Sequence, residues 1–178
     1  AYKDAIEVSR YLKEKKPNCK IMAGGYLGTA KTLLKNAPVD VIVRGEAEIT
    51  AVELVDALMS SKRLEGIPGL TLLRGGDYFL TPHRHQVENL DDIPYPNFEL
   101  VELHRYLIPA EKAMYFRRDP RHVKYHGFLI DIKTSRGCTH SCSFCYRHVK
   151  GIRQHSPEYV LDFMQYLHDT YNIVFFNI

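Results

Sequence analysis

The sequence predicts an α/β fold, and three features of the 178-residue chain lead to this prediction. Apolar residues recur at helical spacing in several segments, and these segments alternate with short runs rich in β-branched residues. Such alternation is typical of a parallel sheet with helices on both faces. Hydrophobic residues make up 45% of the chain, enough for a packed core, and no apolar run of about 18 residues could span a membrane.

The first 60 residues contain three predicted helices and two predicted strands. Residues 1–16 form an amphipathic helix, and the apolar run over 20–23 forms a short buried strand. Thr29 caps a second helix, residues 39–43 form the next strand, and a third helix follows. The apolar residues expected to face the core are Ala1, Ala5, Val8 and Leu12 in the first helix, Ala30, Leu33, Leu34 and Ala37 in the second, and Val52, Val55, Leu58 and Met59 in the third.

The middle of the chain carries a predicted hairpin and a predicted domain boundary. Residues 70–74 and 78–81 flank Gly75-Gly76-Asp77, which is a typical hairpin turn. Two prolines then hold the following segment extended. We therefore expect a first domain over residues 1–88, a linker over 89–125 and a second domain over 126–178.

Residues 97–125 mix basic and aromatic side chains, a combination that can bind nucleic acid. The formal net charge of the chain is only +3, however, which is too small to indicate such a partner. We expect a solvated connector here and no nucleic-acid binding. The residues concerned are Lys112, Tyr115, Phe116, Arg117, Arg118, Arg121, Lys124 and Tyr125.

The second domain is predicted to begin with a strand–helix–strand unit. Residues 128–132 form the first strand, and Ser156 caps a helix that has Pro157 at its first position. Residues 172–178 form the second strand. A cysteine-rich loop joins the first strand to the helix, at the kind of strand end where parallel α/β folds place their active sites.

Three of the chain's four cysteines lie within eight residues, at Cys138, Cys142 and Cys145. Disulfide bonding does not account for three close thiols because one stays unpaired, whereas thiolates at these spacings can bind one soft metal centre. Two centres remain open: a zinc site completed by His140, His148 or a distant ligand, and an iron–sulfur cluster. Free cysteines also indicate a reducing compartment, so we expect a cytoplasmic protein.

The cysteine spacing resembles the signature of the radical S-adenosylmethionine (radical SAM) enzymes, as do Phe144 before the last cysteine and the Thr-Ser-Arg-Gly before the first. The resemblance implies that Cys138, Cys142 and Cys145 hold a 4Fe-4S cluster, whose fourth iron binds S-adenosylmethionine. It implies that Phe144 and Tyr146 contact this cofactor. It also implies reductive cleavage to a 5′-deoxyadenosyl radical, with an external electron donor of the flavodoxin or ferredoxin type.

The first 98 residues resemble the cobalamin-binding domain that precedes the barrel in many radical SAM proteins. The resemblance rests on Met-Ala-Gly-Gly at 22–25, Val-Arg-Gly-Glu-Ala-Glu at 43–48 and Leu-Asp-Asp-Ile-Pro at 90–94. Together the two resemblances imply the C-terminal part of a Rossmann-like (flavodoxin-like) cobalamin-binding domain, followed by the first βα units of a radical SAM partial TIM barrel. The residues implied at the cobalamin are Gly24, Gly25, Arg44, Gly45 and Glu46.

Two family motifs have no counterpart in the sequence: the Asp-x-His-x-x-Gly whose histidine binds cobalt, and the Gly-Gly-Glu-type segment of the barrel. We therefore expect either a fragment of a longer protein or a family member that lacks them. The leading function is a cobalamin-dependent radical SAM enzyme that performs methyl transfer or a radical rearrangement on an unidentified substrate. One alternative is a methylthiotransferase-like enzyme, whose extra cluster cysteines Cys19 alone cannot supply, since we expect that thiol in the core. The other is a zinc-stabilised nucleic-acid-binding module.

Overall fold

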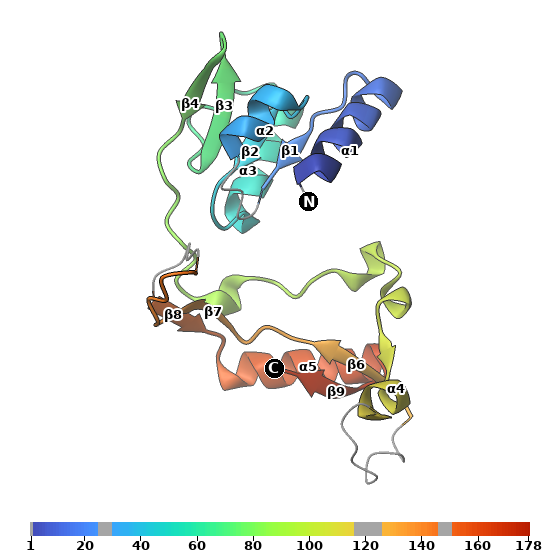
Figure 1. The fold of residues 1–178 in the computed structure, drawn as a ribbon. Helices are drawn as coiled ribbons and strands as arrows, with labels where there is room; N and C mark the ends of the chain where they lie inside the picture. The colour runs from blue at the N-terminus through green and yellow to red at the C-terminus, as the bar shows by residue number, and fades with distance from the viewer. Residues whose placement is uncertain (1, 25–29, 116–125, 146–150) are drawn as a thin grey trace. The chain divides into compact units, whose positions relative to one another are not determined.

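The computed structural model describes residues 2–24, 30–115, 126–145 and 151–178 (Figure 1). The chain divides into two compact units, residues 1–87 and 88–178, and each is described by itself. The mixture of helices with parallel and antiparallel strands confirms the predicted α/β class. Among the described residues, no helix is long and apolar enough to cross a membrane.

The first unit contains one four-stranded sheet, with the strands in the order β1-β2-β3-β4. Strands β1 and β2 are parallel, as predicted, whereas β2, β3 and β4 pair antiparallel, so the hairpin extends the same sheet. The elements are α1 (Tyr2–Lys15), β1 (Met22–Ala23), α2 (Ala30–Asn36), β2 (Val41–Val43), α3 (Glu48–Met59), β3 (Leu70–Arg74) and β4 (Asp77–Leu80).

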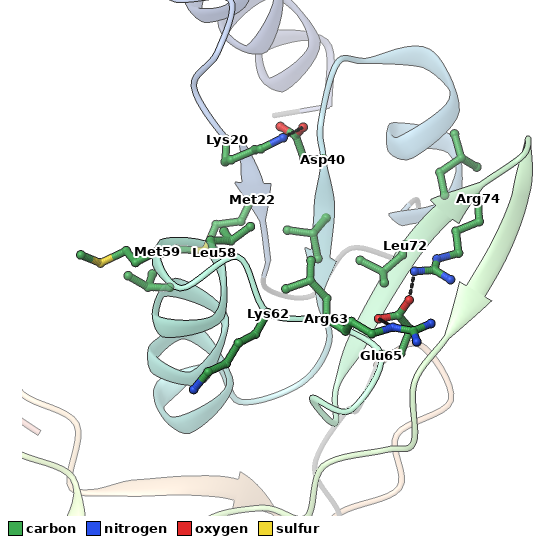
Figure 2. Close-up of a pocket in the computed structure, with 14 residues that line it drawn as sticks. Lys20, Met22, Asp40, Leu58, Met59, Lys62, Arg63, Glu65, Leu72 and Arg74 are labelled. Carbon is green, nitrogen blue, oxygen red and sulfur yellow. Dashed lines mark ion pairs between the residues drawn. The ribbon is translucent and has the colours of Figure 1, made fainter.

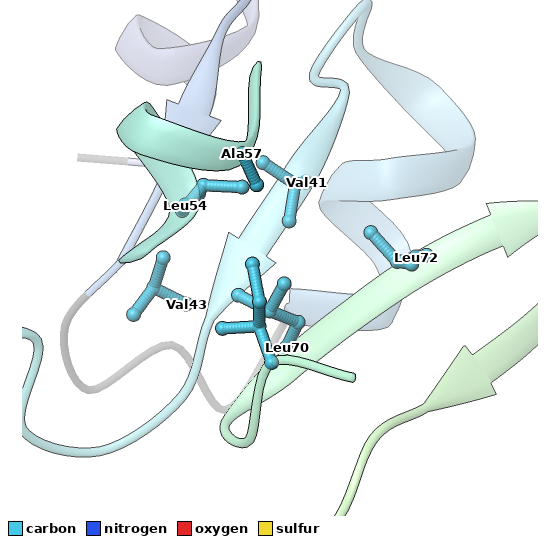
Figure 3. Packing of buried hydrophobic residues seen from close by; sticks show 7 residues of the cluster. Val41, Val43, Leu54, Ala57, Leu70 and Leu72 are labelled. Carbon is cyan, nitrogen blue, oxygen red and sulfur yellow. The ribbon is translucent and has the colours of Figure 1, made fainter. Parts of the chain in front are cut away.

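Strand β2 lies at the centre of the core, and its alternate residues face opposite sides of the sheet. Ile42 packs with Leu33 and Leu34 of α2, and residues of α1 pack against the same cluster. On the other side Val41 and Val43 pack with Leu54 and Ala57 of α3 and with Leu70 and Leu72 of β3 (Figure 3). Helices therefore cover both faces of the sheet, which confirms the predicted doubly wound arrangement.

The predicted inner face of α1 was only partly right: Ala5 packs against the core, but Val8 and Leu12 do not. Val8 is 56% exposed and Leu12 is also exposed, whereas Ser9 is buried. The buried hydroxyl of Ser9 donates to the carbonyl of Ile6 at 2.9 Å, so a polar residue can lie on the inner face without losing a hydrogen bond. The inner side of the helix is formed by Tyr2, Ala5, Ile6 and Ser9, while Ala1 lies outside the described residues.

The predicted inner face of α3 was also only partly right: Leu58 packs against the core, but Val52, Val55 and Met59 do not. Thr50, Leu54 and Ala57 are buried, and Leu58 is only partly buried. Val52, Val55 and Met59 are exposed, Met59 by 82%. Leu54, the small Ala57 and Thr50, which donates to the carbonyl of Pro68, form the buried stripe, and Val52, Val55 and Met59 lie beside it. In α2, by contrast, the predicted Leu33, Leu34 and Ala37 are buried, and Thr29 lies outside the described residues.

The hairpin between β3 and β4 is confirmed, with a shorter turn than predicted. Asp77 is the first residue of β4 and pairs with Arg74, so the turn consists of Gly75 and Gly76 alone. Both glycines have positive φ angles, 56° and 91°. A two-residue turn of this kind suits glycine because side chains disfavour positive φ at both positions.

The second unit has a three-stranded sheet of order β5-β6-β9 and a separate hairpin, β7-β8. Strand β6 pairs antiparallel with β5 and parallel with β9. The strands are β5 (Ile108–Pro109), β6 (Phe128–Asp131), β7 (Ser135–Cys138), β8 (Gly151–Gln154) and β9 (Ile173–Asn177). The helices are α4 (Ala110–Tyr115), α5 (Pro157–Tyr171) and the 3-10 helices η1 (Leu90–Asp92), η2 (Phe98–Leu100) and η3 (Leu103–Arg105).

Strands β6 and β9 with helix α5 form the predicted strand–helix–strand unit. Ser156 caps α5 by accepting a hydrogen bond from the backbone N–H of Tyr159 at 3.1 Å, and Pro157 follows it. Leu167 of α5 is buried against Ile132 and Ile173. The sequence predicted that Asn172 belongs to β9. Instead, Asn172 ends α5 in the left-handed conformation, with a φ angle of 54°.

The segment 89–115, expected as part of a linker, forms η1, η2, η3, β5 and α4 within the second unit. The ring of Tyr95 stacks on Phe163 of α5, with the ring centroids 4.6 Å apart. The Tyr159 hydroxyl donates to the carbonyl of Ile93 at 2.8 Å. Residues 93–95 are thus attached to α5. Most of the basic and aromatic residues of 97–125 lie outside the described residues.

Candidate metal and cofactor site

The cysteine loop connects the two strands of a hairpin that the sequence analysis missed. Strand β7 pairs antiparallel with β8, from Ser135 opposite Gln154 to Cys138 opposite Gly151. The loop was expected to run directly from a strand into helix α5, whereas an additional pair of strands intervenes. Neither short strand has a continuous apolar run, so periodicity carried no signal for either of them.

The three clustered thiols are exposed and free of disulfide bonds. Between them the chain makes a turn, in which the N–H of Cys145 donates to the carbonyl of Cys142 at 3.1 Å. The backbone N–H of His140 donates to the sulfur of Cys138 at 3.4 Å. Phe144 is 89% exposed. Tyr146 and His148 lie outside the described residues.

The donor set of this loop fits an iron–sulfur cluster in its chemistry. Three thiols within eight residues are free and accessible, and thiolates are the ligands that such clusters take. The loop conformation itself does not gather them: within the described parts of the chain, no three His, Cys, Asp or Glu side chains converge closely enough to hold a metal ion. The sulfur atoms are therefore accessible but not preassembled.

The base of the hairpin is bonded to residues from η1. The carboxylate of Asp91 accepts hydrogen bonds from the backbone N–H of Ser156, at 3.1 and 3.3 Å, and lies 3.0 Å from Nδ1 of His155. The backbone N–H of His155 donates to the carbonyl of Thr134 at 2.9 Å, immediately before β7. The sequence analysis did not identify Asp91 or His155, because they are 64 residues apart and no short motif contains both.

The charge and environment of this network shift two pKa values. Hydrogen bonds from the side chain of Ser156 lower the pKa of Asp91, against a smaller upward effect of burial, and the Ser156 backbone and His155 lower it further. Burial, then the nearby Tyr95 and Asp91, raises the pKa of Tyr159. Asp91 is therefore an ionised acceptor and Tyr159 a neutral donor near neutral pH.

A cavity of about 370 Å³ lies beside this network in the second unit. Ile130, Ile132 and Phe163 contribute apolar surface to it, while Arg136 and His155 contribute polar groups. The cavity therefore borders both β7 and the first turn of α5.

The described residues expected at a cobalamin, Gly24 and residues 44–46, directly follow the parallel strands β1 and β2 and so lie at the same end of both strands. A Cβ built on Gly24 would lie 3.5 Å from the carbonyl oxygen of Val43, an ordinary contact, so the end of β1 adjoins the end of β2. Gly45 has a φ of 76° and open space around it, whereas Gly25 lies outside the described residues. The packing of the chain itself does not require a glycine at position 24. A ligand that approaches the backbone closely would be a separate reason for a glycine there.

Arg44 and Glu46 are bonded to their own chain. The guanidinium of Arg44 donates to the carbonyl of Thr81, and its backbone N–H donates to the carbonyl of Gly69 at 2.7 Å. Burial lowers the pKa of Arg44. Glu46 accepts a hydrogen bond from the N–H of Val87 at 3.2 Å. Both side chains thus fasten the segment after β4 to the end of β2.

A larger cavity, of about 690 Å³, lies at the opposite end of strands β1 and β2 and was not predicted (Figure 2). Its apolar lining includes Val55, Leu58 and Leu72. Five of its charged residues are paired within the chain: Lys20 lies 3.7 Å from Asp40, and Glu65 forms ion pairs with Arg63 and Arg74. Cys19, expected in the core, is half-buried, and its sulfur lies 3.9 Å from the carbonyl oxygen of Leu12.

Comparison with known proteins gives related sequences over nearly the whole chain. An uncharacterised methyltransferase of Pyrococcus horikoshii is 32% identical over 96% of this chain and 35% of its own length. An anaerobic magnesium-protoporphyrin IX monomethyl ester cyclase of Synechocystis is 27% identical over 100% of this chain and 34% of its own. The cobalamin-dependent radical SAM methyltransferase TokK of Streptomyces tokunonensis is 26% identical over 81% of this chain and 20% of its own length.

Solved structures share the fold. The cobalamin-dependent S-adenosylmethionine radical enzyme OxsB matches 97% of this chain and 23% of its own, with a TM-score of 0.66 and 20% identity. The radical S-adenosylmethionine methyltransferase TsrM of Kitasatospora setae matches 94% of this chain and 31% of its own, with a TM-score of 0.59 and 20% identity. No protein-family model matches the chain. The chain spans about a third of the length of the first curated relatives it matches.

Proposed function

We propose, from the premise that this chain belongs to the radical SAM family in the subclass that carries a cobalamin-binding domain, that it holds a 4Fe-4S cluster on Cys138, Cys142 and Cys145. The cluster would serve a protein that reductively cleaves S-adenosylmethionine. The observation that carries this proposal is the group of three free, exposed thiols in the β7–β8 loop.

The number of thiols supports cleavage of S-adenosylmethionine over a structural metal. Three thiolates leave one iron of a four-iron cluster without a protein ligand, and an open coordination position is typical of catalytic metal sites. A cluster held by Cys138, Cys142 and Cys145 would supply the electron that cleaves S-adenosylmethionine. Phe144, exposed between Cys142 and Cys145, and Tyr146 lie in sequence where they would cover the bound cofactor.

We propose cobalamin-dependent methyl transfer as the reaction of the whole protein, with a radical rearrangement or ring closure as the alternative. Relatives named as methyltransferases, one of them cobalamin-dependent, favour the first, and the relatives named as cyclases keep the second open. In this chain the strand-end turns at Gly24 and Gly45 would approach the cobalamin, and Gly25 would join them because it follows Gly24 in the sequence. Arg44 and Glu46 would support that edge, because their side chains are bonded to their own chain.

An external electron donor of the flavodoxin or ferredoxin type and a reducing cytoplasm complete the proposal. The thiols of the loop are exposed and would be oxidised in an oxidising compartment. The substrate stays an open part of the proposal, as does any role of the basic segment before β6.

The experiment that tests the cluster is anaerobic reconstitution of the chain with iron and sulfide. We expect brown protein that contains close to four irons and four acid-labile sulfides per chain, in proportion to the proposed 4Fe-4S cluster. Addition of S-adenosylmethionine should change the electron paramagnetic resonance spectrum of the reduced cluster, because it binds the open iron. Colourless protein with one zinc per chain would contradict the proposal and support the zinc-stabilised module.

Cobalamin is tested separately by titration of the chain with hydroxocobalamin and observation of its visible spectrum. We expect weak or undetectable binding of cobalamin. The strand ends described here offer glycine turns, but the side chain of Arg44 is hydrogen-bonded within its own chain and is not available to the ligand. Tight binding that Arg44→Met abolishes, without loss of stability, would show that Arg44 contacts the ligand and would contradict its supporting role.

A further inference from the structure

Asp91 lies in η1, in a segment that the sequence analysis assigned to a linker. Asn89 caps η1 by accepting a hydrogen bond from the backbone N–H of Asp91 at 3.3 Å, which fixes the start of this short helix. The carboxylate of Asp91 is 27% exposed and points to the joint between β8 and α5. An ionised carboxylate accepts only, so the Nδ1 atom of His155, 3.0 Å away, is the donor.

The residues that Asp91 binds form the end of the cysteine hairpin that lies away from the loop. His155 directly follows β8, and its N–H bond to the carbonyl of Thr134 continues the pairing of β7 with β8 by one more residue. Ser156 is the N-cap of α5. Asp91 therefore bonds to the one point where the returning strand of the hairpin meets the helix.

A second contact closes the network. The imidazole of His155 is only 11% exposed and stacks on the ring of Tyr159, with centroids 4.2 Å apart and planes 12° from parallel. The hydroxyl of Tyr159 donates to the carbonyl of Ile93, two residues after Asp91. His155 is thus held between a carboxylate and an aromatic ring that both connect to the same segment.

We propose that Asp91 is a positioning residue for the cysteine loop: it holds the β8–α5 joint, and through it the β7–β8 hairpin that presents Cys138, Cys142 and Cys145. The inference rests on the proposed cluster for its consequence, but its structural part concerns the apoprotein alone. The described residues of the loop, 139–145, are exposed, and the loop continues from the two strands that meet at this base. A charge-assisted pair at this base is well suited to that task.

The test compares Asp91→Asn with Asp92→Asn in the full chain. Both variants remove one negative charge from η1, but the Asp92 carboxylate accepts a hydrogen bond from the side chain of Asn89 and not from the hairpin. Hydrogen exchange of the apoprotein is followed in peptides that cover 134–138 and 151–157. We expect exchange there to be about tenfold faster in Asp91→Asn, which corresponds to the loss of one charge-assisted hydrogen bond, and unchanged in Asp92→Asn.

A second variant, His155→Phe, keeps the ring on Tyr159 but removes the donor to Asp91. It should accelerate exchange in the same two peptides and leave the β3–β4 hairpin of the first unit unchanged. After anaerobic reconstitution, Asp91→Asn and His155→Phe should lose iron to a chelator faster than the unaltered chain. Their reduced clusters should also give a broadened electron paramagnetic resonance spectrum, a change that lower stability alone would not produce.

Two results would overturn the inference: equal exchange in the Asp91 and Asp92 variants, or faster exchange with unchanged iron release and an unchanged spectrum. The first would show that Asp91 does not hold the hairpin. The second would show that the hairpin does not position the thiols. If the unaltered chain holds no iron at all, the proposed cluster fails, whereas the exchange data still decide whether Asp91 holds the hairpin.

Discussion

The strand-end turns of the first unit and the cysteine loop of the second differ in how their polar groups are bonded. At the end of β2, Arg44 and Glu46 are bonded to the backbone of residues 81 and 87, so the chain itself uses its charged side chains. In the loop after β7, three thiols are exposed and unpaired by disulfide. A side chain that is already hydrogen-bonded within its own chain indicates a structural role, whereas an exposed reactive group indicates a role in binding a ligand.

The difference also shows which sequence patterns are specific enough to predict a binding site. The sequence predicts a metal site at the cysteines from their spacing, because thiols so close together have few uses other than metal binding. Charged and glycine residues at strand ends have many uses, and the structure shows a structural one for Arg44 and Glu46. Replacing the cysteines and Arg44 tests this contrast directly, whereas replacing Leu54 and Asp40 tests the packing and charge of the first unit; the expected effects fall from the first to the last.

Single replacement of Cys138, Cys142 or Cys145 by Ala should abolish the cluster. Two thiolates do not hold four irons firmly, so iron and sulfide content after anaerobic reconstitution should fall to background in each variant. Cys19→Ala is the matched control and should retain the cluster, because Cys19 is half-buried and its sulfur lies against the carbonyl oxygen of Leu12. If Cys19 proves necessary, the site has four protein ligands and no open iron.

Leu54→Ala should destabilise the first unit by about 2–5 kcal/mol, the usual range for a fully buried leucine. Leu54 is completely buried against β2 and β3, whereas Met59 on the same helix is mostly exposed. Met59→Ala should therefore change stability by less than about 0.5 kcal/mol. Hydrogen exchange in β2 and β3 measures both, and a larger loss from Met59 than from Leu54 would reinstate the helix face that the sequence predicted.

Arg44→Met should cost about 1–3 kcal/mol of stability in the first unit without any ligand present. The variant keeps an apolar chain but leaves the carbonyl of Thr81 without this donor. Arg63→Met is a suitable control, since the side chain of Arg63 is largely exposed. The same hydrogen-exchange measurement applies, and equal stability of the two variants would mean that Arg44 is available for a ligand after all.

Asp40→Asn should reduce the dependence of stability on acid. Burial raises the pKa of Asp40, but hydrogen bonds from the N–H of Ile21 at 2.7 Å and from Lys13 at 2.9 Å, with the nearby Lys20, outweigh it and the pKa is lowered. A lowered folded-state pKa means that the stabilisation is complete above the unfolded value of about 4 and is lost as pH falls through the folded value.

Unfolding monitored by circular dichroism between neutral pH and about pH 3, which lies below the unfolded value, should show this difference. The chain with Asp40 should lose more stability over the acid range than the Asp40→Asn variant. Asp56→Asn, on the exposed side of α3, serves as the control. Identical acid dependence of the unaltered chain and the Asp40 variant would contradict the assigned role of this carboxylate.

The sequence by itself determined the features that depend on local chemistry. The strand–helix–strand unit around α5 could be predicted because Ser156 and Pro157 mark a helix start regardless of distant contacts. The hairpin at Gly75-Gly76 was predictable because few other residues accept two positive φ angles. The metal site at the three clustered cysteines stays a prediction, and the sequence could make it because thiol chemistry depends little on distant contacts.

Tertiary structure decided which side of a helix is inside and which distant residues meet. Helix α3 buries Thr50 and Ala57 in place of the larger Val52 and Met59. The side of the helix that fits closely against β2 and β3 is buried, even though the apolar side chains on another side are larger. Asp91 reaches His155 only because the aromatic contacts of residues 93–98 attach that segment to α5. Such contacts join residues far apart in the sequence, and a periodic pattern along one segment carries no information about them.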